Sequence, residues 1–149
     1  MDAYAADRIL LGKDIVTLYE DVPDFRVAAN SDGHVVGCGA VHVMWEDLAE
    51  VRTLAVLPEF RGRGIGRDLL DELVATARAL GVERVVCLTF EVDFFARQGF
   101  EVAESVDVAP EVFMQMVRSP DEGIAEFLDL ERVRPNTLGN TRMVRFLRG

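Results

Sequence analysis

The chain has 149 residues, 50% of them hydrophobic, and a formal net charge of −10. This length predicts one domain, residues 1–149, with enough apolar residues for a sizeable core. The acidic balance excludes nucleic acid and anionic membranes as general partners, because both require a basic surface, and no apolar run is long enough to span a bilayer.

The chain gives no sign of export, disulfides or metal binding. Acidic residues stand near the N-terminus where a signal peptide would be basic, so we expect a cytoplasmic protein. Cys38 and Cys87 each lie in an apolar run and are interpreted as reduced, buried thiols. His34 and His42 are far in sequence from any second ligand, so we expect both to be ordinary strand residues and predict no metal site.

The first half of the chain predicts two short helices followed by strands. Helix-like stretches cover residues 2–11 and 14–20, with a break at Gly12. The pattern then predicts strands over residues 25–30 and 34–45, joined by a turn at 30–33 whose Asn, Asp and Gly tolerate the required dihedral angles. Residues 45–50 form a polar connection, and a third strand over 50–57 is stopped by Pro58.

The second half alternates helices and strands. Apolar residues recur every three or four positions from Ile65 to Leu80, which predicts a long helix ended by Gly81. Weaker patterns predict strands over 82–89 and 100–103, helices over 93–98, 109–118 and 121–130, and a strand over 141–147 that closes a sheet edge. The order indicates a mixed α/β fold with one strand–helix–strand unit near its middle.

A basic, glycine-rich loop, Arg-Gly-Arg-Gly-Ile-Gly at residues 61–66, separates the third strand from the long helix. A helix N-terminus has unpaired N–H groups and partial positive charge, glycines allow close approach, and arginines add formal charge. This combination favours a phosphate group over a turn that is basic by chance. The glycine intervals fit neither the Walker loop nor the dinucleotide fingerprint, so ATP and NAD are disfavoured.

The loop resembles the (Gln/Arg)-x-x-Gly-x-(Gly/Ala) motif that holds the pyrophosphate of acetyl-coenzyme A in the GNAT superfamily of N-acetyltransferases. Residues 51–60 resemble the preceding strand of that family, and residues 94–100, FFARQGF, resemble its second signature. The resemblance implies a mixed, mostly antiparallel sheet flanked by helices, with acetyl-CoA as cosubstrate. It also implies these cofactor-binding residues: Leu54, Ala55, Val56, Arg61, Gly62, Arg63, Gly64, Ile65, Gly66, Arg67, Phe94 and Phe95.

Within this superfamily, the chain looks like the short bacterial amino-acid N-acetyltransferases (N-acetylglutamate synthases) that lack an amino-acid-kinase domain, most tightly from Ile9 to Phe100. The stretches that carry this likeness are residues 9–28, 35–43, 48–66, 86–100 and 138–144. This likeness implies acetylation of the α-amine of L-glutamate or L-glutamine, the first step of arginine biosynthesis. That family begins with an edge strand, whereas this chain starts inside the following helix, so we expect the first edge strand to be missing. Phe95 stands where many superfamily members have a tyrosine, which fits the subfamily.

Direct transfer in a ternary complex needs no enzyme nucleophile, and neither cysteine shows a catalytic pairing with histidine. The resemblance implies Glu50 as general base and the backbone N–H of Val56 as oxyanion donor. Their even separation places both side chains on one side of a regular strand, a relation that a bulge would break. Alternatively, Glu50 belongs with Glu46 and Asp47 to a solvated polar loop.

An acidic protein needs placed cations to hold an acceptor with carboxylates. Lys13 matches a basic position of the family, and Arg52 follows Glu50 by two residues and so shares its face of a strand. The remaining candidates for substrate binding are Thr89, Asn140, Thr141 and Arg142. The alternatives are a surface charge for Lys13, an ion pair for Arg52 and an edge-strand role for Arg142.

Two other functions stay open at this point. The chain could acetylate a peptide N-terminus, lysine, polyamine or aminoglycoside, since the acidic residues 45–50 would suit a cationic acceptor. It could also be a regulatory CoA-binding module that has lost turnover, which Phe95 and a missing first strand would permit. A homo-oligomer is left open as well.

Overall fold

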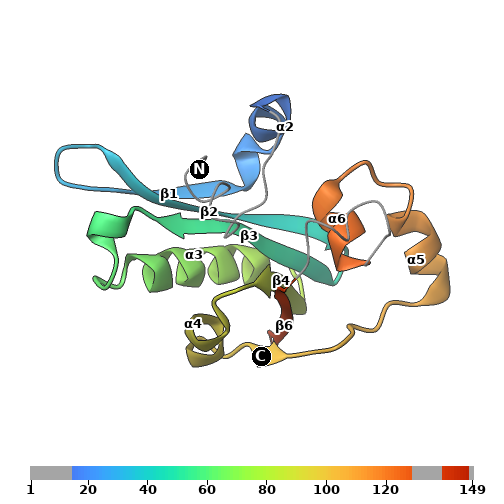
Figure 1. The fold of residues 1–149 in the computed structure, drawn as a ribbon. Coiled ribbons are helices and arrows are strands. Elements are labelled where there is room, and N and C mark those ends of the chain that lie inside the picture. Colours follow the sequence, from blue (N-terminus) through green and yellow to red (C-terminus); the bar gives the residue numbers. More distant parts are fainter. Residues whose placement is uncertain (1–14, 129–138, 148–149) are drawn as a thin grey trace. The chain divides into compact units, whose positions relative to one another are not determined.

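The computed structural model describes residues 15–128 and 139–147, drawn in colour in Figure 1. The chain divides into two compact units, which are described in turn. The first contains the described residues up to His42 together with Val51–Gly81, and the second contains Val43–Glu50 and the described residues from Val82 onward.

The first unit begins with α2 (Ile15–Glu20), η1 (Val22–Asp24) and β1 (Phe25–Ala29). β1 forms an antiparallel hairpin with β2 (Val35–Trp45), in a register that sets Phe25 opposite Ala40. The turn between them is the one that the sequence predicts. The side-chain oxygen of Asn30 accepts hydrogen bonds from the backbone amides of Asp32 and His34, at 3.0 and 2.9 Å. The predicted helix over residues 2–11 lies outside the described residues.

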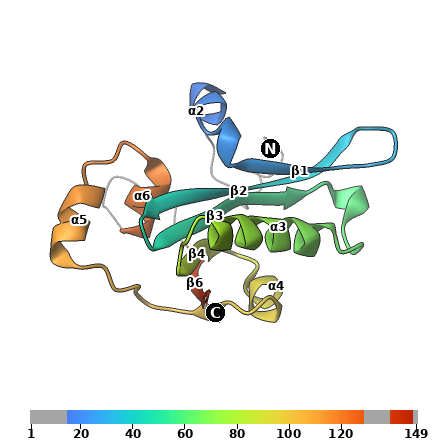
Figure 2. The same cartoon turned by 180° about the vertical axis from the view of Figure 1, so that it is seen from behind.

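Helix α3 (Ile65–Ala79) packs against the hairpin and completes the first unit, as Figure 2 shows from behind. Its buried face has the predicted spacing and consists of Leu69, Leu70, Leu73, Val74 and Ala77. Gly37 and Gly39 of β2 permit close approach, since a Cβ atom on Gly39 would lie 2.8 Å from Leu73 Cδ1. Gly81, just past the helix, has a left-handed φ of 86°, as expected of a C-terminal cap.

The second unit is built on β4 (Arg84–Thr89) and β6 (Thr141–Phe146). The other elements are α4 (Val92–Arg97), β5 (Glu101–Val102), α5 (Pro110–Met116) and α6 (Glu122–Phe127). The start of β3 (Leu48–Val56) runs parallel to β4, with Leu48 opposite Arg84 and Glu50 opposite Val86. A hydrophobic core gathers the side chains of Met44, Leu48, Val86, Met116, Ile124, Phe127 and Val144.

The strands form one six-stranded sheet in the order β1-β2-β3-β4-β6-β5. The β3–β4 pair is parallel, whereas the β1–β2, β4–β6 and β5–β6 pairs are antiparallel. This arrangement confirms the predicted mixed sheet flanked by helices. None of the helices in the described part of the chain combines the length and apolar character that crossing a bilayer requires.

Two predictions about strands were wrong. The strand over residues 141–147 does not close a sheet edge, because β6 lies between β4 and β5 and β5 is the edge. Residues 48 and 49 are not part of a polar connection: Leu48 and Ala49 belong to β3 and are buried. The acidic residues next to Leu48 and Ala49 in sequence made the start of this strand resemble a polar loop. The expectation that a first edge strand is missing concerns the start of the chain, which lies outside the described residues.

Candidate functional site

The loop between β3 and α3 opens the helix N-terminus to solvent. After β3 the chain forms η2 (Pro58–Phe60) and then passes through Gly62 and Gly64, whose φ values of 79° and 82° are left-handed. Gly64 is the N-cap residue of α3 and makes no side-chain capping bond. The first N–H groups of this 15-residue helix are therefore available to an anion.

Three exposed arginines surround this helix start, and each makes at least one long contact. Arg61 Nε donates to the Val56 carbonyl at 3.4 Å. Arg63 donates to the Glu59 carbonyl at 3.4 Å, with its guanidinium 4.9 Å from the centre of the Phe60 ring. Arg67 lies 3.5 Å from Asp68, both largely exposed. A phosphate could displace such contacts, because charge-assisted bonds are shorter and stronger.

Strand β3 is irregular at Thr53. This residue has a φ of 59°, which is unusual for a β-branched side chain, and its carbonyl accepts the Cys38 thiol at 3.5 Å. The irregularity lies between Glu50 and Val56 and breaks the alternation of side chains. The shared face of Glu50 and Val56 was expected only for a regular strand, and β3 is not regular between them.

Glu50 is buried, with 4% of its surface exposed, and is paired in register with Val86. The alternative that it belongs to a solvated polar loop was wrong, because that loop consists of Glu46, which is exposed, and Asp47, which pairs with Arg84 at 3.2 Å. A carboxylate in a dry setting interacts strongly with neighbouring groups.

Both thiols are held in the neutral form. Burial raises the pKa of Cys38. Burial also raises the pKa of Cys87, and the Glu50 carboxylate raises it further. Neither cysteine forms a disulfide. Cys87 is buried as predicted, whereas Cys38 is only half-buried. The thiolate form needed for nucleophilic attack is disfavoured at both positions.

The pairing of β4 with β6 brings together residues that are about fifty positions apart in sequence. Thr141 lies opposite Thr89, and Arg142 lies opposite Leu88. Thr89 is buried and its hydroxyl accepts the Glu91 amide at 2.8 Å, while Asn140 and Thr141 are half-buried. Three of the candidate acceptor residues thus cluster at one end of this strand pair.

Arg142 has a structural role that the sequence did not reveal. Its two terminal nitrogens donate to the carbonyls of Glu104 at 2.7 Å and Phe127 at 2.8 Å. The guanidinium also lies 5.8 Å from the centre of the Phe127 ring. The edge-strand alternative was wrong, because β6 has a partner on each side.

The second signature forms an aromatic cluster on α4. Phe95 is 5% exposed and makes edge-to-face contacts with Phe94 and Phe100, each at a centroid distance of 5.2 Å. Phe94 is half-buried. Phe95 packs in the core and has no proton to donate. Of the two predicted acceptor cations, Arg52 is half-buried and Lys13 lies outside the described residues.

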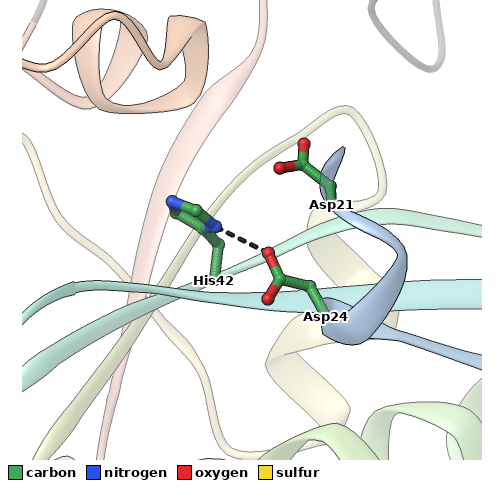
Figure 3. Close-up of side chains that lie close together, drawn as sticks. All are labelled: Asp21, Asp24 and His42. Carbon is green, nitrogen blue, oxygen red and sulfur yellow. Dashed lines mark hydrogen bonds and ion pairs between the residues drawn. The ribbon is translucent and has the colours of Figure 1, made fainter. Parts of the chain in front are cut away.

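A cluster of Asp21, Asp24 and His42 was missed by the sequence analysis (Figure 3). His42 Nδ1 lies 2.6 Å from Asp24 Oδ2, so the prediction that His42 is remote from other ligands was wrong. That prediction relied on distance along the sequence, and Asp24 and His42 are 18 positions apart. The hairpin register offers the missing signal, because pairing Phe25 with Ala40 brings Asp24 beside residues 41 and 42.

A small hollow of about 170 Å³ also lies in the second unit. Part of its lining comes from the acidic stretch 45–50, which the sequence analysis related to a cationic acceptor. The lining residues are Trp45, Glu46, Asp47, Leu48, Arg84, Val108, Ala109 and Val112. The ion pair of Asp47 with Arg84 occupies part of its polar lining.

Comparison with known proteins places the chain in a family. The acetyltransferase (GNAT) family matches residues 4–100, which include the loop and the second signature. The chain belongs to this family. It is 55% identical over 146 residues to an amino-acid acetyltransferase of Mycobacterium tuberculosis, covering 97% of this chain and 83% of the relative. It is also 35% identical over 108 residues to an amino-acid acetyltransferase of Ralstonia nicotianae, covering 71% of this chain and 24% of that longer protein.

Solved structures agree with this assignment. A Mycobacterium tuberculosis protein crystallised with CoA and a ligand denoted NLQ superposes with a TM-score of 0.94, at 54% identity over 99% of this chain and 89% of the other. The N-acetylglutamate synthase of Neisseria gonorrhoeae, complexed with coenzyme A and N-acetyl-glutamate, shares the fold. Its TM-score is 0.77 at 24% identity, over 99% of this chain and 31% of the other. The expected acyltransferase of the GNAT fold is confirmed.

The contacts of Arg142 predict that this residue stabilises the fold. Replacing it in Arg142→Met removes two bonds from a charged donor to main-chain carbonyls, which should lower the free energy of unfolding by about 1–3 kcal/mol. Urea denaturation measures the change. Arg97→Met, at an exposed position of α4, is the control and should change the free energy of unfolding by less than about 0.5 kcal/mol. Equal stability of both variants would contradict a structural role.

Proposed function

We propose that this enzyme transfers the acetyl group of acetyl-CoA to the α-amine of L-glutamate or L-glutamine, as the first step of arginine biosynthesis in the cytoplasm. The observation that carries the proposal is the 55% identity, over 97% of the chain, to a protein named amino-acid acetyltransferase. Relatives crystallised with coenzyme A support the cosubstrate. We further propose that residues 1–149 act as a single GNAT domain.

In this proposal the loop of residues 61–64 and the start of α3 hold the pyrophosphate of acetyl-CoA. Two left-handed glycines and an N-cap without a side-chain bond present main-chain N–H groups, and Arg61, Arg63 and Arg67 neutralise the two phosphates. Residues 54–56 of β3 contact the pantetheine arm, and Phe94 and Phe95 complete the cofactor side. The chemistry of these groups fits an anionic ligand with a long polar tail.

Glu50 acts as the general base. The acceptor enters as an ammonium, and one proton must leave its nitrogen before that nitrogen can attack the thioester carbonyl. A buried carboxylate can accept this proton directly or through one water. As the new C–N bond forms, the Val56 N–H stabilises the oxyanion, an interaction that can be worth about 3 kcal/mol. The C–S bond then breaks, the nitrogen releases its second proton to solvent to give the amide, and the thiolate of CoA takes up one proton from solvent.

The acceptor is recognised through its carboxylates. Arg52 and Lys13 supply positive charge, and Thr89, Asn140 and Thr141 supply hydrogen-bonding groups at the end of the β4–β6 pair. Arg142 positions this segment, because two of its nitrogens already bind main-chain carbonyls. A side chain ending in a carboxylate or an amide suits such a set, which is why glutamate and glutamine are both proposed.

An acceptor panel tests the substrate class. Release of free CoA thiol is measured with acetyl-CoA and glutamate, glutamine, lysine, spermidine or a short peptide. We expect kcat/KM for glutamate or glutamine to exceed that for the others by at least about tenfold. Turnover with only polyamines or peptides would overturn the proposed acceptor. Binding of CoA without turnover on any amine would instead indicate a regulatory module.

The base assignment predicts a specific kinetic defect. Glu50→Gln keeps the size of the side chain but cannot accept the proton, so kcat should fall roughly 10²- to 10⁴-fold with little change in the KM for acetyl-CoA. The rise of activity with pH on the acidic side should also disappear. Glu46→Gln, at an exposed neighbour, is the control. An unchanged pH–rate profile in Glu50→Gln would remove Glu50 from this role.

The loop predicts a cofactor-binding defect. Gly64→Ala places a Cβ atom at a left-handed φ of 82°, which strains the loop backbone, and 3.1 Å from Arg67 Nη2, whose side chain must move slightly. The strain costs about 1–2 kcal/mol, and the KM for acetyl-CoA should rise about tenfold. Gly33→Ala imposes the same strain at φ 83° in the β1–β2 turn, with no atom within 4 Å. That control should lose stability but keep its KM; a raised KM in both variants would contradict the assignment.

A further inference from the structure

We infer that Asp21, Asp24 and His42 form a binding site for a divalent transition-metal ion of the zinc type. One potential ligand atom from each of the three residues lies within 4.8 Å of the other two. Figure 3 shows that the side chains come from separate elements. Asp21 precedes η1, Asp24 is the last residue of η1, and His42 projects from β2. No residue assigned to acetyl transfer belongs to this cluster.

The donor set selects the class of ion. An imidazole nitrogen with two carboxylate oxygens suits Zn²⁺ and related ions, whereas Mg²⁺ and Ca²⁺ prefer oxygen alone. Two aspartates with a neutral histidine carry two negative charges, which a dication balances. The chain as a whole, at −10, also attracts cations.

The geometry requires only a local adjustment. His42 Nδ1 and Asp24 Oδ2 lie 2.6 Å apart, joined by one hydrogen bond. Two ligands held at about 2.0–2.1 Å from a tetrahedral zinc ion lie roughly 3.3 Å apart. On binding, the Nδ1 proton is lost to solvent, and the neutral imidazole carries its proton on Nε2. The distance between His42 Nδ1 and Asp24 Oδ2 increases by about 0.7 Å. Asp21 then closes the third position by a side-chain rotation.

The cluster is partly buried, so an ion can reach it while the surrounding backbone stays fixed. The side chains of His42 and Asp24 are 24% and 28% exposed, so an ion can reach them without opening the core. The β1–β2 hairpin fixes the backbone on both sides of the pair, since Phe25 is in register with Ala40. A bound ion would fasten η1 to β2, and three protein ligands leave a fourth position for water.

Titration of the full chain, freed of metal by a chelator, tests the site with Zn²⁺ as the probe. Calorimetry should show one ion bound per chain, and both Asp24→Asn and His42→Gln should weaken binding by at least about tenfold. A paired control replaces polar residues of the same hairpin that lie outside the cluster, Asp32→Asn and His34→Gln, and should leave the affinity unchanged. Circular dichroism of each metal-free variant confirms that it is folded.

Substitution of Co²⁺ for Zn²⁺ separates this cluster from the thiols. Its absorption spectrum should lack a sulfur-to-metal band, because the ligands are nitrogen and oxygen. Three results would overturn the inference: a dissociation constant weaker than roughly 100 μM, comparable losses in the control variants, or a sulfur band that assigns the ion to Cys38 or Cys87. Since binding is read without activity, the outcome is independent of the proposed acetyl transfer.

Discussion

The close packing of α3 on β2 fixes the position of the glycine-rich loop at residues 61–64. Two glycines on one face of β2 leave no side chain between strand and helix, and a Cβ atom on Gly37 would lie 3.1 Å from the carbonyl of Ala55. Because the helix sits so near, η2 and the loop of residues 61–64 are held between the end of β3 and the first turn of α3. The arginines and the helix dipole then act at one place, and a bulkier strand would displace both.

The second unit buries the Glu50 carboxylate and the Cys87 thiol on neighbouring strands. Glu50 sits almost fully enclosed in β3, and Cys87 on the adjacent strand is kept neutral by its surroundings and by that carboxylate. A buried carboxylate is costly to maintain, and such cost is typical of functional positions rather than of structural ones. Burial also keeps the Cys87 thiol from acting as a nucleophile.

Sequence alone predicted the features that depend on local patterns. The long helix, its glycine cap and the hairpin turn followed from periodicity and turn chemistry, and the loop followed from the residues 61–66. Features that depend on pairing between distant segments were missed. The place of β6 inside the sheet, the contacts of Arg142 and the contact of Asp24 with His42 each require the register of strands, which a single sequence does not encode locally.

The double attachment of Arg142 limits how specificity can change within this fold. One guanidinium ties β6 to the segment after β5 and to the end of α6, so an exchange at this position alters packing in several places at once. In the proposed acceptor site, Thr89 and Thr141 lie opposite each other across β4 and β6 and, within the described residues, make no such contacts with two other segments. Under that proposal, changes of acceptor preference would occur more easily at these hydroxyl positions, with Arg142 retained.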